Sequence, residues 1–210
     1  MNRRFLGCVA AALLAFSVAG ITTLAQAADE SPDALIQRLS DEVLGTIRSD
    51  KTLQSGDVSR VIALVDSKIM PSVNFQRMTA AAAGPAWRQA TPEQQKRLQD
   101  EFKTLLVHTY SGALTQVSDQ TISIKPQRGA ATDTEVVVRT EVRGRGDPIQ
   151  LDYRMEKTPA GWKIYNLNVL GVWLVETYRS QFAQEINAKG IDGLIATLAA
   201  RNKTNATKKV

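Results

Sequence analysis

Residues 135–156 read EVVVRTEVRGRGDPIQLDYRME, and this stretch decides the fold because apolar and polar side chains alternate along most of it. Apolar residues and one threonine share one side: Val136, Val138, Thr140, Val142, Ile149, Leu151, Tyr153 and Met155. The other side carries mainly charged and amide side chains. Alternation with a period of two is typical of antiparallel strands that have one apolar and one solvated face. The glycines and the proline of residues 144–148 supply a turn, so the stretch predicts a hairpin.

Two more strands flank this hairpin. A first strand follows Gln120, and a fourth spans Trp162 to Leu170 after the turn at residues 158–161. Together they predict a four-stranded antiparallel meander that Gly171 ends. The fourth strand breaks the alternation, since apolar residues fall on both of its faces: Trp162 and Ile164 on one, Tyr165, Leu167 and Val169 on the other. We therefore expect this strand to be covered on both sides.

Helical patterns surround the strands. Ser31-Pro32-Asp33 opens a first helix, and a second follows Gly56 and ends at Pro71. A short helical piece covers residues 75–83, and Thr91-Pro92-Glu93-Gln94 opens a long helix that reaches about Thr115. Two helices follow the sheet, the last of them short. The sequence predicts an α+β fold in which a helical layer packs on one face of a small, twisted four-stranded antiparallel sheet.

The two ends of the chain do not belong to this domain. Arg3 and Arg4 precede an apolar stretch that runs to about Leu24, and residues 25–27, Ala-Gln-Ala, fit a signal-peptidase site. This site and the polar residues near it favour cleavage after Ala27 over an uncleaved membrane anchor. We therefore expect a signal peptide at residues 1–27, a single domain at residues 28–200 and a basic, disordered tail at residues 201–210.

The composition argues against most catalytic chemistry. Cys8 is the only cysteine and lies in the signal peptide, and His108 is the only histidine, so a zinc set or a Cys/His pair is not expected. Loss of Arg3 and Arg4 lowers the formal net charge from +5 to +3, which does not indicate nucleic-acid binding. We expect no enzyme and no metal. The apolar pattern predicts an interior, and on periodicity alone an ordinary filled core is favoured over a cavity.

A series of stretches resembles one known family. These are residues 71–75 (PSVNF), 84–91 (GPAWRQAT), Phe102 with residues 109–110 (TY), 138–142, 151–153 (LDY), 161–165 (GWKIY), 171–182 ending in YRSQF, and 190–195 (GIDGLI). In this order they resemble the MlaC family, also called the toluene-tolerance or Ttg2D-like proteins. The likeness covers nearly the whole chain after the signal peptide.

The resemblance implies a periplasmic phospholipid carrier that works as the soluble component of an Mla-type ABC transport system. Its expected partners are phospholipid, an inner-membrane complex of MCE-domain and ABC-transporter proteins, and an outer-membrane lipoprotein complex. We expect a monomer that has no cofactor other than bound lipid. The resemblance implies that the fold encloses an apolar lipid pocket. Its expected lining residues are Phe75, Phe102, Leu105, Leu106, Tyr110, Val136, Val138, Val142, Leu151, Tyr153, Met155, Ile164, Leu174 and Tyr178.

Four positions depart from the family pattern. Asn74 and Asn166 stand where the family often has Asp, Leu170 stands where it often has Glu, and Trp173 replaces a small polar residue. Leu170 and Trp173 make the region after the fourth strand more apolar. Two alternatives stay open on these grounds: a carrier of hopanoid or another non-phospholipid cargo, and a structural or interaction module without lipid.

Overall fold

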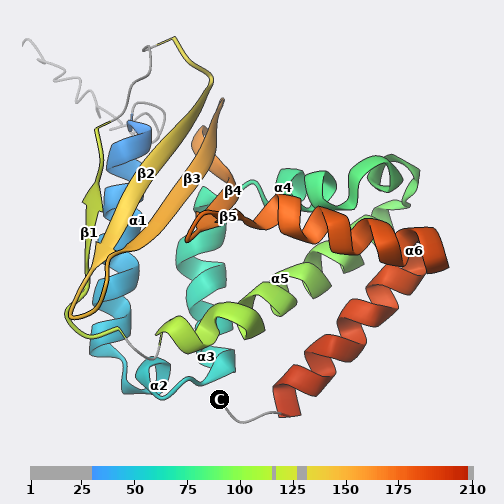
Figure 1. The fold of residues 1–210 in the computed structure, drawn as a ribbon, viewed down its shortest axis with the longest axis horizontal. Coiled ribbons are helices and arrows are strands. Elements are labelled where there is room, and N and C mark those ends of the chain that lie inside the picture. Colours follow the sequence, from blue (N-terminus) through green and yellow to red (C-terminus); the bar gives the residue numbers. More distant parts are fainter. Residues whose placement is uncertain (1–29, 115–116, 127–131, 208–210) are drawn as a thin grey trace, which may run out of the picture.

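The computed structural model describes residues 30–114, 117–126 and 132–207 of the 210-residue chain. Residues 1–27, predicted as a signal peptide, lie outside the described residues, as do residues 208–210. The described part has the predicted α+β architecture, with helices beside an antiparallel sheet (Figure 1).

The sheet has five strands in the order β1-β2-β3-β4-β5, all antiparallel. They are β1 (Thr121–Ile124), β2 (Glu135–Arg143), β3 (Ile149–Thr158), β4 (Gly161–Val169) and β5 (Val172–Trp173). The prediction of four strands is wrong because the chain does not leave the sheet at Gly171. It reverses through Leu170 and Gly171, both at positive φ, and Val172 then pairs with Val169.

A bulge explains the irregular pattern of β4. The register shifts between Arg154 and Met155, so that Met155 lies opposite Ile164 while Arg154 lies opposite Asn166. Tyr165 is the extra residue, and it changes the phase of the alternation. The apolar residues on both sides of the bulge therefore share one face of the sheet, contrary to the expectation. The other face of β4 is also covered, because Asn166 and Asn168 are buried there.

Helix α1 (Pro32–Ser49) covers the apolar face of the sheet. Ser31 caps it as predicted, accepting a hydrogen bond from the Ala34 backbone N–H at 3.2 Å. Leu35, Ile36 and Leu39 pack against residues of β2, β3 and β4. Figure 1 shows α1 running along the sheet.

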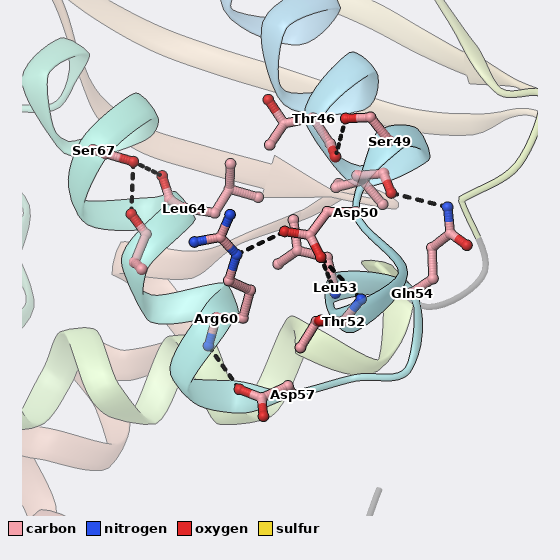
Figure 2. A network of polar contacts seen from close by, with 12 residues as sticks. Thr46, Ser49, Asp50, Thr52, Leu53, Gln54, Asp57, Arg60, Leu64 and Ser67 are labelled. Carbon is pink, nitrogen blue, oxygen red and sulfur yellow. Dashed lines mark hydrogen bonds and ion pairs between the residues drawn. The ribbon is translucent and has the colours of Figure 1, made fainter.

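The connection from α1 to the next helices is fixed by Asp50 (Figure 2). Its carboxylate caps α2 (Lys51–Gln54) by accepting hydrogen bonds from the backbone of Thr52 and Leu53, and it pairs with Arg60 at 2.6 Å. Arg60 belongs to α3 (Val58–Leu64), which continues through the π-helical η1 (Val65–Ile69) and the 3₁₀-helical η2 (Met70–Ser72). One carboxylate thus joins three consecutive elements.

The central helices begin at the predicted signals. Helix α4 spans Phe75–Ala83, the 3₁₀ helix η3 spans Gly84–Gln89 and α5 spans Pro92–Leu114. The capping box at the start of α5 is confirmed: the Gln94 side chain accepts from the Thr91 N–H at 2.9 Å, and the Thr91 hydroxyl accepts from the Gln94 N–H at 3.2 Å.

Helix α6 runs from Leu174 to Thr207 with a kink at Gly190, where φ is 70°. The two arms correspond to the two helices predicted after the sheet, but the second arm continues to Thr207 and is longer than the short helix that was predicted. The prediction that residues 201–210 are disordered is wrong for residues 201–207, which continue the second arm. Packing anchors this end, because the buried Asn202 side chain donates to the Glu101 backbone carbonyl on α5 at 2.9 Å.

Candidate functional site

The structure divides most of the predicted lining residues between two buried clusters. The helical cluster contains Phe75, Phe102, Leu105, Leu174 and Tyr178, with Leu106 partly buried against it. The sheet cluster contains Val138, Tyr153, Met155 and Ile164, with Val136 and Leu151 partly buried against it. Val142 is partly buried outside both clusters, and Tyr110 is exposed. The predicted residues thus form two groups.

Phe102 is the centre of the helical cluster and is fully buried. Its ring centroid lies 5.7 Å from that of Phe75, 4.9 Å from that of Tyr178 and 5.1 Å from that of Phe182. The contacts with Tyr178 and Phe182 are edge-to-face, a favourable geometry for aromatic pairs. Because α4, α5 and α6 all supply rings, this aromatic group joins the three helices.

The sheet cluster lies between α1 and the apolar face of β2, β3 and β4. Its main polar atom is the Tyr153 hydroxyl, which interacts with the hydroxyls of Ser40 on α1 and Thr140 on β2. Burial raises the pKa of Tyr153 well above its ordinary value, so the phenol stays neutral. The Ser40 and Thr140 hydroxyls each donate to a backbone carbonyl, that of Ile36 and that of Leu151, both at 2.6 Å.

Val73 and Leu167 connect the two clusters. Both are partly buried, and both pack against residues of the helical cluster and of the sheet cluster. Val73 also forms a parallel bridge with Ile164. Neither residue is in the predicted set. Leu167 was missed because the alternation, read without the bulge in β4, places it on the wrong face of the sheet. Its apolar side chain was the one sign in the sequence that it belongs to the lining.

The apolar face of the sheet has a closed end and an open end. At the closed end, Val138, Met155 and Ile164 are buried, with at most 4% of any of them exposed. The pairs Val142–Ile149 and Val169–Val172 lie at the open end. Ile149 is 45% exposed and Val172 is 53% exposed. Burial therefore decreases along one continuous apolar face.

The polar face carries an arginine network at the closed end. Arg77 of α4 pairs with Glu135 at 2.6 Å and also with Glu156, and its guanidinium lies 3.7 Å from the centroid of the Tyr165 ring. The hydrogen bond from Arg77 holds the pKa of Glu135 below its ordinary value. This network fastens α4 to the sheet.

A second network joins the sheet to α6. Arg154 pairs with Glu176 and lies 4.0 Å from the centroid of the Trp173 ring. The Asn166 amide donates to Glu176 at 2.8 Å while its oxygen accepts from the Val175 N–H at 3.1 Å. The departure from Asp at this position therefore has a structural role, because only an amide can donate to the glutamate and also cap the helix.

Asn74, the other departure from Asp, has a comparable role at the start of α4. Its side-chain oxygen accepts from the Arg77 N–H at 3.0 Å, and its amide donates to Glu156 at 2.7 Å. The amide thus caps the helix and also links it to β3.

Across residues 30–114, 117–126 and 132–207, no group of three or more His, Cys, Asp or Glu side chains is placed to hold a metal ion. None of the helices in this part of the chain is long and apolar enough to cross a membrane. The prominent features are the two apolar clusters and the surface between them.

Comparison with known proteins identifies the family. The model of the MlaC protein family matches residues 37–200, which include the whole helical cluster and all of the sheet cluster except Leu35 and Ile36. The chain belongs to the MlaC family. The resemblance to the MlaC and Ttg2D proteins that was predicted from the sequence is confirmed.

Curated relatives and a solved structure agree with this assignment. The intermembrane phospholipid transport system binding protein MlaC of Haemophilus influenzae is 24% identical over 182 residues, which cover 85% of each chain. The toluene tolerance protein Ttg2D of Pseudomonas putida is 26% identical over 167 residues, 79% of this chain and 77% of the relative. A phospholipid-binding protein from Ralstonia solanacearum, solved in complex with a phospholipid, is 49% identical. It has a TM-score of 0.81 and covers 83% of this chain and 98% of its own.

Proposed function

We propose that this MlaC-family protein is a periplasmic phospholipid-binding component of an intermembrane lipid transport system. The observation that carries the proposal is the 49% identity, over nearly the whole of that chain, to a protein solved with a phospholipid bound. The names of the two curated relatives point to the same role. Binding and release of lipid are sufficient for this function, so the proposal includes no catalytic step.

The acyl chains are proposed to lie between the helical cluster and the sheet cluster. Val73 and Leu167 contact both clusters and remain only partly buried, as expected of residues that line a space a ligand fills. They join the predicted lining residues, of which Leu106, Val136, Val142 and Leu151 are also partly buried. Burial of apolar surface contributes roughly 25 cal/mol per Å², so two acyl chains can bind with few polar contacts.

The transport partners follow from the family. We propose exchange of lipid with an inner-membrane complex of MCE-domain and ABC-transporter proteins and with an outer-membrane lipoprotein complex, by a monomeric carrier. The relative from Haemophilus influenzae supports this through its name, which assigns it to an intermembrane transport system. Residues 1–27 are proposed as the cleaved signal peptide and residues 28–200 as the single lipid-binding domain.

The test is the identity of the lipid that accompanies the protein. The protein is purified from the periplasm without detergent, and its organic extract is analysed by mass spectrometry. We expect phospholipid in amounts comparable to the protein. A polycyclic lipid in place of phospholipid would show that the protein is a hopanoid carrier. An extract without lipid would contradict the carrier function. The control is a periplasmic protein that does not bind lipid, purified in parallel, which measures the lipid that co-purifies nonspecifically.

A further inference from the structure

Exposed aliphatic side chains gather at the open end of the apolar sheet face. In the described part of the chain, the large apolar residues that are exposed are Tyr110, Ile149, Leu170 and Val172. Three of them lie at the same end of the sheet. The Leu170 N–H donates to the Gln150 carbonyl at 3.0 Å, which places Leu170 beside the start of β3, and Val172 pairs with Val169. Ile149 is the first residue of β3.

This surface continues the interior. Val169 lies opposite both Leu151 and Val172, and residues directly opposite each other in a sheet share a face. Val169 is partly buried against the helical cluster and Leu151 against the sheet cluster. An unbroken apolar strip therefore leads from the surface between the two clusters to the exposed side chains of Ile149 and Val172.

Leu170 occupies its position at a conformational cost. Its φ is 52°, and Gly171 follows with a φ of 87°, the pair of signs found in type I′ hairpin turns. Such turns strongly favour Asn-Gly, because a side chain with a bulky γ-carbon is strained at positive φ. The chain nevertheless places a leucine there, with 64% of it exposed.

The hairpin that precedes Ile149 carries charged residues beside the apolar side chains. Arg143 pairs with Glu141 at 2.7 Å and Arg145 pairs with Asp119 at 3.3 Å, and both arginines remain largely exposed. The aliphatic side chains of Ile149, Leu170 and Val172 match the hydrocarbon of an acyl chain.

We propose that the open end, formed by Ile149, Leu170 and Val172, is the portal through which the acyl chains of a phospholipid enter and leave the protein. This inference rests on the proposed carrier function. The portal residues contact the chains during transfer, while the residues between the clusters hold them at rest. Their replacement by polar residues slows transfer and leaves the amount of lipid bound at saturation unchanged.

The experiment separates rate from capacity. The mature protein, freed of lipid, is mixed with vesicles of phosphatidylethanolamine and phosphatidylglycerol that contain a fluorescent phospholipid. The variant combines Ile149→Thr, Leu170→Asn and Val172→Thr, which suit strand and turn positions. The control is Ala160→Asn, an exposed residue in the β3–β4 turn at the opposite end of the sheet. Far-ultraviolet circular dichroism confirms that each variant is folded.

We expect the initial uptake rate of the triple variant to fall by roughly tenfold or more, with saturation and the control unchanged. Uptake by the triple variant at the wild-type rate would contradict the portal proposal. An equal loss of uptake rate and of lipid bound at saturation would also contradict it, because these residues would then belong to the site that holds the lipid at rest. A dimer of the wild type that the substitutions dissociate, at an unchanged uptake rate, would make the surface a self-interface and also overturn it. A wild type that takes up no lipid would refute the carrier function itself.

Discussion

The closed and open ends of the apolar sheet face share one sequence pattern and differ in their environment. Both consist of aliphatic residues that alternate with polar ones. At the closed end, Leu35, Ile36 and Leu39 of α1 pack over the strands, and Ile164 is 4% exposed. At the open end, Ile149 is 45% exposed. One end of the face therefore stabilises the fold, while the other end is available to a ligand.

The largest difference between the two ends is expected when the same side chain, isoleucine, is truncated to alanine at each of them. Ile164→Ala removes a buried side chain beside Met155, and we expect it to lower the free energy of unfolding by about 2–5 kcal/mol. Ile149→Ala should change it by less than about 0.5 kcal/mol, since the side chain is half exposed. Urea denaturation of the lipid-free variants measures both values. Equal losses at the two positions would show that the open end is packed as tightly as the closed end.

A second effect concerns the polar side of the closed end, where Arg77 ties α4 to Glu135 and Glu156. Arg77→Met keeps an unbranched apolar stem but removes the charged guanidinium, and we expect a loss of about 1 kcal/mol at pH 7. The variant should still bind lipid, because Arg77 lies on the face opposite the apolar clusters. Thermal unfolding monitored by circular dichroism gives the loss.

This loss should depend on pH. The folded-state pKa of Glu135 lies below its ordinary value of 4.5, mainly because of the hydrogen bond from Arg77. Its stabilising contribution is therefore present above about pH 4.5 and disappears as the pH falls through the lower folded-state value. The difference between wild type and Arg77→Met should shrink in acid. A difference that stays constant from pH 7 to pH 3 would show that packing, and not charge, holds α4.

The smallest effect is expected at the open end. Leu170→Asn places the preferred residue in a turn with positive φ, so the variant should be more stable by about 0.5–1 kcal/mol. The same substitution removes an aliphatic side chain from the portal and should slow lipid uptake. Opposite signs for stability and uptake would support a leucine kept for function. A destabilised variant would mean that Leu170 makes packing contacts that outweigh the strain.

Much of this fold was predictable from local patterns. Three local patterns each predicted the backbone conformation correctly: the alternation in β2 and β3, the cap at Ser31, and the capping box at Thr91 and Gln94. The bulge at Tyr165 was missed, because the break in the alternation was interpreted as a strand covered on both faces and not as one inserted residue that changes the face of those after it. The missed strand β5 has only two residues, and the turn before it contains a leucine where Asn would have been a signal.

The site was predictable only in part, for a related reason. Periodicity identifies which residues face inward, and most of the predicted lining residues are buried. It does not show that they divide into two clusters or that Val73 and Leu167 connect them, since that depends on how α1 and α6 pack on opposite parts of the sheet. The helical end of the chain was missed because its basic residues indicated solvation, whereas Asn202 anchors it to α5.

The surface between the helical cluster and the sheet cluster allows the most direct test of lipid binding. Leu167→Trp fills this surface with a larger apolar side chain, and native mass spectrometry compares the variant with the wild type. We predict that the wild type carries the mass of one phospholipid, and that Leu167→Trp loses it while its urea midpoint stays near the wild-type value. A wild type with only the bare chain mass, or a variant that unfolds because a filled core is overpacked, would contradict the claim that the two clusters enclose a lipid.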